Sequence, residues 1–240
     1  MVYLRKNLFP LFIIYGTIHL IEKGRGLSMA KTIITIAREF GSGGHEVAEK
    51  AGKLLGIPFY DKELIALAAK ESGLSESLFD GIEEKPTTSL LFSLVMGLQA
   101  GQATQYRYGD FLNTDAIFRI QSQVIRSLAD KGSCVIVGRC SDYVLREEPN
   151  LINVFVRADI DQRTQRIMEL YHLKEKEALD VILKNDKHRS SFYNFYANKV
   201  WGSVDNYDLS LNTSKITHDH AAELIVSYVK MAQENAADKH

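Results

Sequence analysis

TIITIAREFGSGGHEVA, residues 32–48, is the stretch that decides the fold. Residues 32–37 are β-branched or aliphatic, which is typical of a strand buried on both faces of a sheet. Residues 41–44 are Gly-Ser-Gly-Gly, and the apolar residues that follow recur at helical spacing: Val47, Ala48, Ala51, Leu54 and Leu55. A strand that leads through glycines into a helix is the layout of a phosphate-binding loop.

The predicted loop would bind phosphate through its backbone. Glycines let the chain turn tightly and bring N–H groups against a phosphate, and the next helix adds the positive end of its dipole. We therefore assign the phosphates of ATP to Gly41, Ser42, Gly43, Gly44 and His45. A standard Walker loop has lysine where Gly44 stands, and Ser or Thr for magnesium where Glu46 stands. An ordinary strand-to-helix turn without nucleotide is the alternative.

Composition favours one α/β domain with a small lid. The chain has 240 residues, of which 45% are hydrophobic and 25% charged. A net charge of −1 gives no overall field for nucleic acid or an acidic membrane, so we predict neither as a partner. Cys134 and Cys140 flank one predicted strand, roughly 20 Å apart, too far for a disulfide. Reduced thiols favour a cytoplasmic protein, and no Cys/His spacing predicts a metal site.

Four ordered blocks extend the pattern beyond the loop: IAREFGSGGH (36–45), GIPFYDKEL (56–64), VIVGRC (135–140) and NYDLSLNTS (206–214). Together they resemble the cytidylate-kinase-like family, over about Thr32 to Val229. The family belongs with the nucleoside monophosphate kinases of the P-loop class. The resemblance implies ATP and Mg²⁺ as cofactors and a small-molecule nucleotide, CMP or dCMP, as phosphoryl acceptor.

Residues 1–28 do not fit the rest of the chain. Basic residues precede an apolar run from Leu8 to Ile21, which is too short to span a bilayer comfortably and lacks a cleavage site. Met29 stands immediately before the first strand. We expect 1–28 to be a non-native or disordered leader and 29–240 to be the kinase-like domain.

A chain that begins at Met29 is therefore expected to be as soluble and as active as the full chain, because nothing in 1–28 belongs to the sheet pattern. Expression of both forms, with comparison of their yields and specific activities, checks this. Loss of folding on truncation would show that the leader is structural.

Charged residues follow two predicted strands. Asp61 ends the strand that begins at Gly56, where it either caps the next helix or faces the ligand crevice. Arg139 follows the strand 134–138, and an arginine at this edge can clamp a phosphate. In cytidylate kinases a Gly-Arg-Asp motif lies at this point and holds the acceptor. Here Cys140 stands in place of the Asp of that motif, and we assign its role to Asp142.

Three further segments are expected to serve the substrate or the transferred phosphoryl group. Residues 73–112 are expected to form a helical insertion, at the place where such kinases have the acceptor-binding module. Arg107 is the phosphate contact that we assign within it. The apolar cluster 90–96 of this insertion either covers the sheet or forms a face of a homo-oligomer. Residues 184–202 correspond to the lid of this fold, whose cations close over the transferring phosphoryl group, and Lys187 and Arg189 are the catalytic cations that we assign there. Arg163 and Arg166, one helical turn apart, form a basic stripe that we assign to the substrate.

The missing Walker lysine needs a replacement cation. Lys31 and Lys53 lie too far along the strand and the helix, whereas Arg38 borders the loop and is charged at every physiological pH. Arg38 is therefore our catalytic candidate; the alternative is that it pairs with Glu39 or Glu46 and braces the loop.

Alternating strands and helices predict a mostly parallel sheet flanked by helices. The function that follows is ATP-dependent phosphoryl transfer to a nucleoside monophosphate. A non-catalytic nucleotide-binding or regulatory protein, or a kinase of another small-molecule acceptor, are the alternatives.

Overall fold

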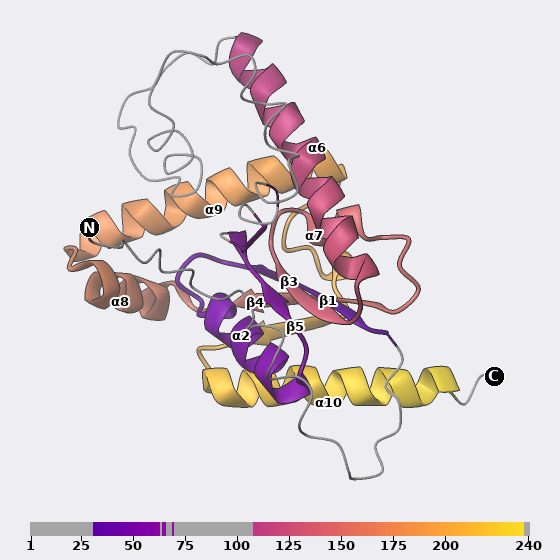
Figure 1. Cartoon of the computed structure of the whole chain (residues 1–240). Coiled ribbons are helices and arrows are strands. Elements are labelled where there is room, and N and C mark those ends of the chain that lie inside the picture. The colour runs from indigo at the N-terminus through magenta and orange to yellow at the C-terminus, as the bar shows by residue number, and fades with distance from the viewer. Residues whose placement is uncertain (1–30, 63, 66–68, 70–107, 238–240) are drawn as a thin grey trace, which may run out of the picture. The chain divides into compact units, whose positions relative to one another are not determined.

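The computed structural model describes residues 31–62, 64, 65, 69 and 108–237 (Figure 1). The leader 1–28, Arg107 and most of the predicted insertion 73–112 lie outside the described residues. All that follows concerns the compact unit that begins at Lys31.

Five parallel strands form one sheet in the order β2-β3-β1-β4-β5. Their bounds are β1 Ile33–Arg38, β2 Phe59–Tyr60, β3 Cys134–Val137, β4 Leu151–Arg157 and β5 Leu209–Asn212. The strand next to the glycine loop, β1, lies at the centre, and its residues Ile33, Ile34 and Ile36 are almost fully buried. The prediction of a mostly parallel sheet is confirmed.

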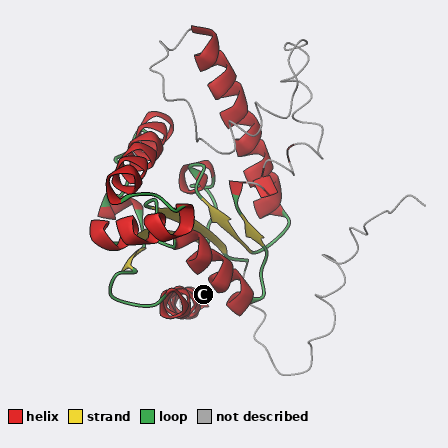
Figure 2. Cartoon of the chain, turned by 90° about the vertical axis from the view of Figure 1, so that its left-hand side faces the viewer, coloured by secondary structure: helices red, strands yellow, loops and turns green. Residues whose placement is uncertain are grey.

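Helices cover both faces of this sheet, as the strands and surrounding helices in Figure 2 show. The described helices are α2 Gly44–Leu55, α6 Tyr108–Asp130, α7 Ser141–Val144, α8 Ile160–Tyr171, α9 Glu175–Ala197 and α10 His218–Ala237. α2 and α10 pack on one face, where Ile34, Val135 and Val154 belong to their core cluster. α6 packs on the other face, against Ile33 and Ile136. Because strands with apolar side chains on both faces need cover on both sides, this layering follows from the sequence of β1 and β3.

Three predicted elements differ from the structure. The strand expected over 205–212 is only Leu209–Asn212, because Val204–Asn206 forms a 3₁₀ turn in which Asn206 Nδ2 donates to Val200 O at 2.7 Å. The tail expected to be frayed from residue 233 continues α10 to Ala237. Residues 184–197 of the lid segment 184–202 belong to the continuous helix α9.

Helix α9 is continuous because one of its faces packs along its whole length. Ile182, Tyr193 and Ala197 are buried at helical spacing. Tyr193 and Ala197 join the cluster of Cys140, and Ile182 joins that of α8.

Both cysteines are buried free thiols, as predicted. Burial raises the pKa of Cys134 and of Cys140 to about 12, so neither is a reactive thiolate near neutral pH. No helix in the described part of the chain has the length and apolar character that a membrane span requires.

Candidate functional site

The glycine loop between β1 and α2 has the backbone conformation that its sequence predicts. Gly41 and Gly43 have φ angles of +82° and +75°, which side-chain-bearing residues rarely adopt. Ser42 Oγ donates to Glu39 O at 2.9 Å and accepts from Gly44 N at 3.3 Å. Ser42 is therefore an internal support of the loop, and the absence of side chains at Gly43 and Gly44 lets His218 and Arg38 approach its backbone closely.

Arg38 fills the space next to Gly44. A Cβ atom added to Gly44 would lie 2.6 Å from Arg38 Cβ, and one added to Gly138 would lie 2.2 Å from Arg38 Nη1. The Arg38 side chain thus crosses Gly44 and reaches the end of β3. Gly44 stands at the position of the Walker lysine. It has no room for a side chain, because the Cβ and Cγ atoms of Arg38 occupy the adjacent space.

Glu39 and Glu46, the carboxylates that the sequence suggests as partners of Arg38, contact other basic side chains. Glu39 is 3.6 Å from Arg163 Nε and also accepts from Ala158 N at 3.0 Å. Glu46 pairs with Arg166 and His218. Both carboxylates therefore have other basic partners, and the catalytic role of Arg38 remains a prediction.

Gly43 faces an imidazole from the other end of the chain. A Cβ atom on Gly43 would lie 2.2 Å from Nε2 of His218, the first residue of α10. Thr213 Oγ1, in the segment before α10, donates to Ser42 O at 2.7 Å. The segment between β5 and α10 therefore forms one wall of the loop.

We expect Gly43→Val to weaken ATP binding while leaving the protein folded. The new side chain would meet the His218 ring and would sit at a φ of +75°, so the strain costs about 1 kcal/mol or more and falls on the loop. Calorimetric ATP titration together with thermal unfolding checks this. Gly56→Val is the matched control, because Gly56 also has positive φ but has open space around it and lies at the far end of α2. Unchanged ATP affinity in folded Gly43→Val would remove the loop from the nucleotide site.

Three consecutive left-handed residues follow β3. Gly138, Arg139 and Cys140 have φ angles of +73°, +58° and +52°. Left-handed backbone costs a side-chain-bearing residue roughly 1–2 kcal/mol. Strain of this kind concentrates at functional sites, where the surrounding structure holds it. Here it turns the chain sharply so that Arg139 stands at the carboxyl edge of the sheet.

Cations from four elements gather at this edge. The pKa of His188 is lowered, first by its partial burial and then by Arg139, Arg189 and Lys62. Burial also lowers the pKa of Arg189, and Arg139 acts in the same direction. Arg189 Nη1 donates to Arg38 O at 3.1 Å, and its guanidinium lies 5.2 Å from the centre of the Phe40 ring. The arrangement brings like charges together, which is favourable where an anion binds between them.

Lys187 differs from its neighbour Arg189. Lys187 is exposed, whereas Arg189 is half-buried against the loop. The two assigned lid cations thus lie on different sides of α9, and Arg189 is the one that the structure brings to the site.

Asp61 caps a helix and contacts the loop as well. Its Oδ1 accepts from Leu64 N at 2.9 Å, and its Oδ2 lies 3.0 Å from Nε2 of His45. The capping alternative is therefore confirmed, and a contact with substrate remains a prediction.

Asp142 is bound within the protein. Tyr193 OH donates to its Oδ2 at 2.6 Å, and burial raises the pKa of Asp142 above its ordinary value. This carboxylate connects α7 with α9, and its assignment to the acceptor remains a prediction that would require it to exchange partners.

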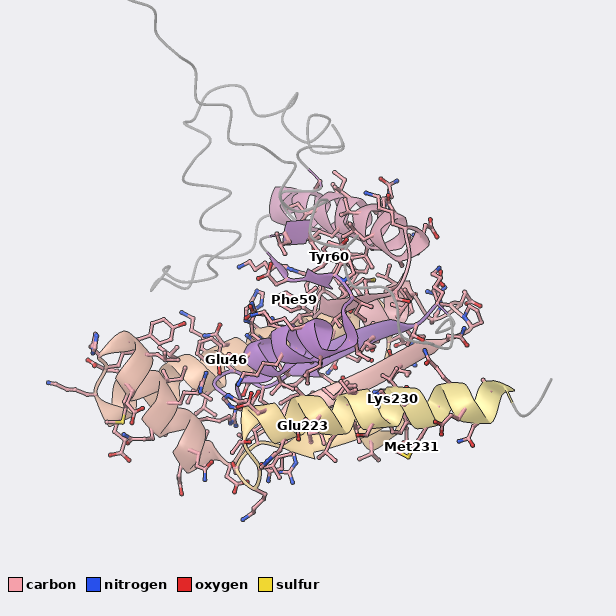
Figure 3. The ribbon with its side chains drawn as sticks, turned by 60° about the horizontal axis from the view of Figure 1, so that its bottom comes forward. Glu46, Phe59, Tyr60, Glu223, Lys230 and Met231 are labelled. Carbon is pink, nitrogen blue, oxygen red and sulfur yellow. The ribbon has the colours of Figure 1, made fainter. Side chains whose placement is uncertain are left out.

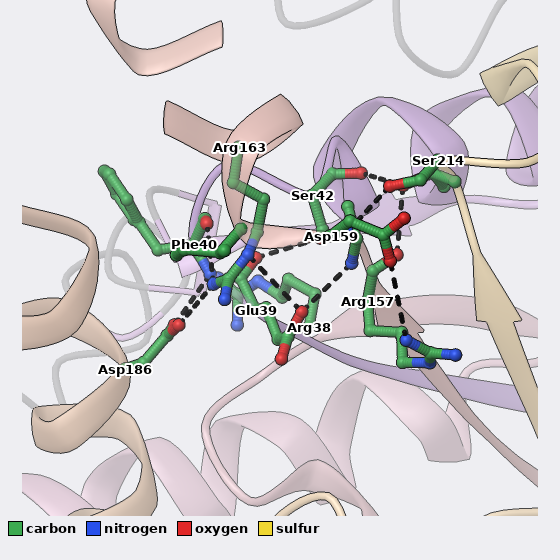
Figure 4. Close-up of polar contacts among 12 residues, drawn as sticks. Arg38, Glu39, Phe40, Ser42, Arg157, Asp159, Arg163, Asp186 and Ser214 are labelled. Atoms are coloured by element: carbon green, nitrogen blue, oxygen red, sulfur yellow. Dashed lines mark hydrogen bonds and ion pairs between the residues drawn. The ribbon is translucent and has the colours of Figure 1, made fainter. Parts of the chain in front are cut away.

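Arg163 and Arg166 have internal partners, as Figure 4 shows for Arg163. Arg163 Nη1 donates to Asp186 Oδ2 at 2.5 Å and to Phe40 O at 3.3 Å. Arg166 pairs with Glu46. The sequence reasoning missed Asp186 and His218 as partners of the loop, because no local pattern links residues so far apart in the chain.

The described residues include no group of three or more His, Cys, Asp or Glu side chains that could hold a metal ion. At the position where a Walker loop offers a hydroxyl to magnesium, the carboxylate of Glu46 is already paired with Arg166 and His218.

The protein has a P-loop kinase-like α/β fold. Its central parallel strand leads through a glycine loop into a helix, and helices cover both faces of the sheet. The chain belongs to the cytidylate kinase-like family, whose model matches residues 33–215. The four sequence blocks that suggested this family are thereby confirmed.

The chain is also similar to several known proteins. A crystal structure of an uncharacterized protein from Eubacterium ventriosum has 33% sequence identity and a TM-score of 0.63, over 83% of this chain and 99% of that one. The structure of TT1252 from Thermus thermophilus has 17% identity and a TM-score of 0.50, over 83% and 97% of the two chains, and shows the fold alone. A cytidylate kinase of Sulfolobus acidocaldarius is 23% identical over 123 residues, which are 51% of this chain and 66% of that protein's length.

Proposed function

We propose that this protein transfers a phosphoryl group from ATP to a nucleoside monophosphate, CMP or dCMP. The observation that carries the proposal is Arg38, whose side chain lies across Gly44, the position of the absent Walker lysine. A guanidinium stays charged at physiological pH and can serve two phosphate oxygens at once. The loop lacks the Walker lysine, and the Arg38 guanidinium beside it, near Gly138 at the end of β3, is the cation that we propose takes over its role.

The position of the loop supports ATP as its ligand. The backbone of Gly43 and Gly44 stands at the start of α2, where the helix dipole favours a negative charge. Mg²⁺, when bound, would neutralise charge on the transferring phosphoryl group. Such magnesium is held mostly by the nucleotide's phosphates and by water, which suits a loop whose Glu46 is occupied.

The residues of this chain would act by position and charge. The loop backbone would orient the donor phosphates, and Arg38 would stabilise charge that develops on the transferred group. Arg139 would hold the acceptor's phosphate at the end of β3. Arg189, which donates to Arg38 O, supports the loop beside them. None of these roles needs a covalent intermediate.

Two alternatives have their own support. Glu46, in place of the hydroxyl that binds magnesium, favours a nucleotide-binding protein without catalysis. The cations near His188 would accept other anionic small molecules as phosphoryl acceptors, since charge alone does not select a base. A nucleotide kinase would act in the cytoplasm, where the free thiols of Cys134 and Cys140 are stable.

A coupled assay of ADP formation tests the proposal. The purified protein is given ATP and each nucleoside monophosphate in turn, with and without Mg²⁺. We expect magnesium-dependent ADP formation that CMP or dCMP stimulates most. ATP binding without ADP formation would favour the non-catalytic alternative. Stimulation by sugar or carboxylate acceptors, but by no nucleotide, would favour the other one.

A further inference from the structure

Helix α8 holds the phosphate loop at two points. Arg163 and Arg166 stand one turn apart on α8, so their side chains leave the same face of the helix. Arg163 reaches Phe40 at the start of the loop, and Arg166 reaches Glu46 just after it. Figure 3 shows Glu46 at the start of α2, near one end of α10.

The start of the loop is held by both of its backbone groups. Phe40 N donates to Asp186 Oδ1 at 2.7 Å, and Phe40 O accepts from Arg163 Nη1 at 3.3 Å. Arg163 also binds the other oxygen of Asp186, at 2.5 Å, so the arginine and the carboxylate hold the peptide between them. The Arg163 residue is only 8% exposed. The buried guanidinium is held through its Nη1, while its Nε has no hydrogen-bond partner among the described residues and lies 3.6 Å from Glu39.

The carboxylate just after the loop is bound by side chains from two helices. Glu46 Oε1 pairs with Arg166, and Glu46 Oε2 lies 2.7 Å from His218 Nδ1. An uncompensated carboxylate in the first turn of α2 would repel a phosphate on the neighbouring loop. The ion pair with Arg166 offsets that repulsion, and it also connects α2 with α8.

We propose that Arg163 and Arg166 are positioning residues that hold the two ends of the phosphate loop, and that Arg166 also offsets the charge of Glu46. On this proposal neither arginine contacts the nucleotide, in contrast to the substrate role that the sequence suggests. The inference rests on the proposed function only in that the loop binds phosphate.

A double-mutant cycle on Arg166 and Glu46 tests the electrostatic part by calorimetric ATP titration. Arg166→Met leaves the Glu46 carboxylate next to the phosphates with one basic partner fewer, and should weaken ATP binding roughly tenfold. Glu46→Gln should bind at least as tightly as wild type. The double variant should regain most of the lost affinity, because it has no carboxylate to neutralise. A double variant as weak as Arg166→Met would mean that Arg166 contacts the phosphate directly, and would overturn the proposal.

Hydrogen exchange of residues 39–46 tests the mechanical part without nucleotide or catalysis. Loss of the contacts at Phe40 should raise the exchange rate of these amides roughly tenfold in Arg163→Met, since exchange reports local opening. Arg163→Lys keeps the charge but cannot hold Phe40 O and Asp186 together. Its exchange rate should therefore lie between those of wild type and Arg163→Met. Exchange at the wild-type rate in both variants would overturn the proposal.

Arg146→Met is the matched control for both measurements. Arg146 is an exposed arginine whose carboxylate partner is Glu147, 3.3 Å away. Glu148, two residues after Arg146, pairs with Lys31. Lys31 precedes β1, whereas the glycine loop follows β1, so this part of the chain lies at the end of the strand away from the loop. We expect wild-type ATP affinity and exchange, because exposed pairs contribute little. If wild type itself binds no ATP, the proposed function fails, while the exchange rates still decide whether α8 holds the loop.

Discussion

Arg38→Met is expected to lower the rate of phosphoryl transfer by roughly two orders of magnitude or more, as loss of a group that stabilises transition-state charge does. Methionine keeps an unbranched stem to pack over Gly44, where Arg38 Cβ and Cγ lie close, so the variant removes the charge with little change in packing. Initial rates at saturating ATP and acceptor measure the effect.

Arg38→Lys is the control for charge. Lysine supplies a cation but not the planar fork of a guanidinium, so we expect its rate to lie between those of wild type and Arg38→Met. Thermal unfolding of both variants shows whether the Arg38 contacts also stabilise the fold. A rate for Arg38→Met within a factor of about three of wild type would place the compensating charge elsewhere, or leave the loop backbone and magnesium to act alone.

Arg139→Ala should impair use of the acceptor by about 1.5–3 kcal/mol, the contribution of a charge-assisted contact, while ATP affinity changes far less. The reason is position: Arg139 stands after β3, whereas the donor phosphates are assigned to the loop after β1. The ratio kcat/KM for the acceptor, compared with the Kd for ATP, separates the two. Equal losses for both ligands would contradict the assignment.

Arg139→Gly provides an internal control for backbone strain. Residue 139 has a φ of +58°, which both Arg and Ala adopt at a cost and Gly adopts freely. The glycine variant should therefore unfold with a free energy about 1 kcal/mol higher than the alanine variant. Its loss of acceptor use should nevertheless match that of Arg139→Ala, because both lack the guanidinium. Recovery of acceptor use in Arg139→Gly would mean that backbone conformation, and not charge, matters at this position.

The sequence by itself determined the centre of the fold. β-branched residues before Gly41, glycines through Gly44 and the apolar spacing from Val47 are local features, and each acts within a few residues of the next. They predicted β1, the loop and α2, and the four sequence blocks predicted the family. The sequence also placed Arg38 next to the loop, because adjacency in the chain guarantees it.

Tertiary structure alone decided which charged side chains have partners within the protein. Arg166 meets Glu46 across 120 positions of sequence, and Phe40 meets Asp186 across 146. In the sequence, the basic stripe of α8 reads as substrate cations and the basic segment of α9 as catalytic lid cations, since a local pattern shows a charge but not its partner. Asp142 is likewise bound by Tyr193 from a helix 51 residues away. Partner choice depends on how helices pack around the sheet, because only that packing brings distant charges within the few ångströms over which ion pairs form.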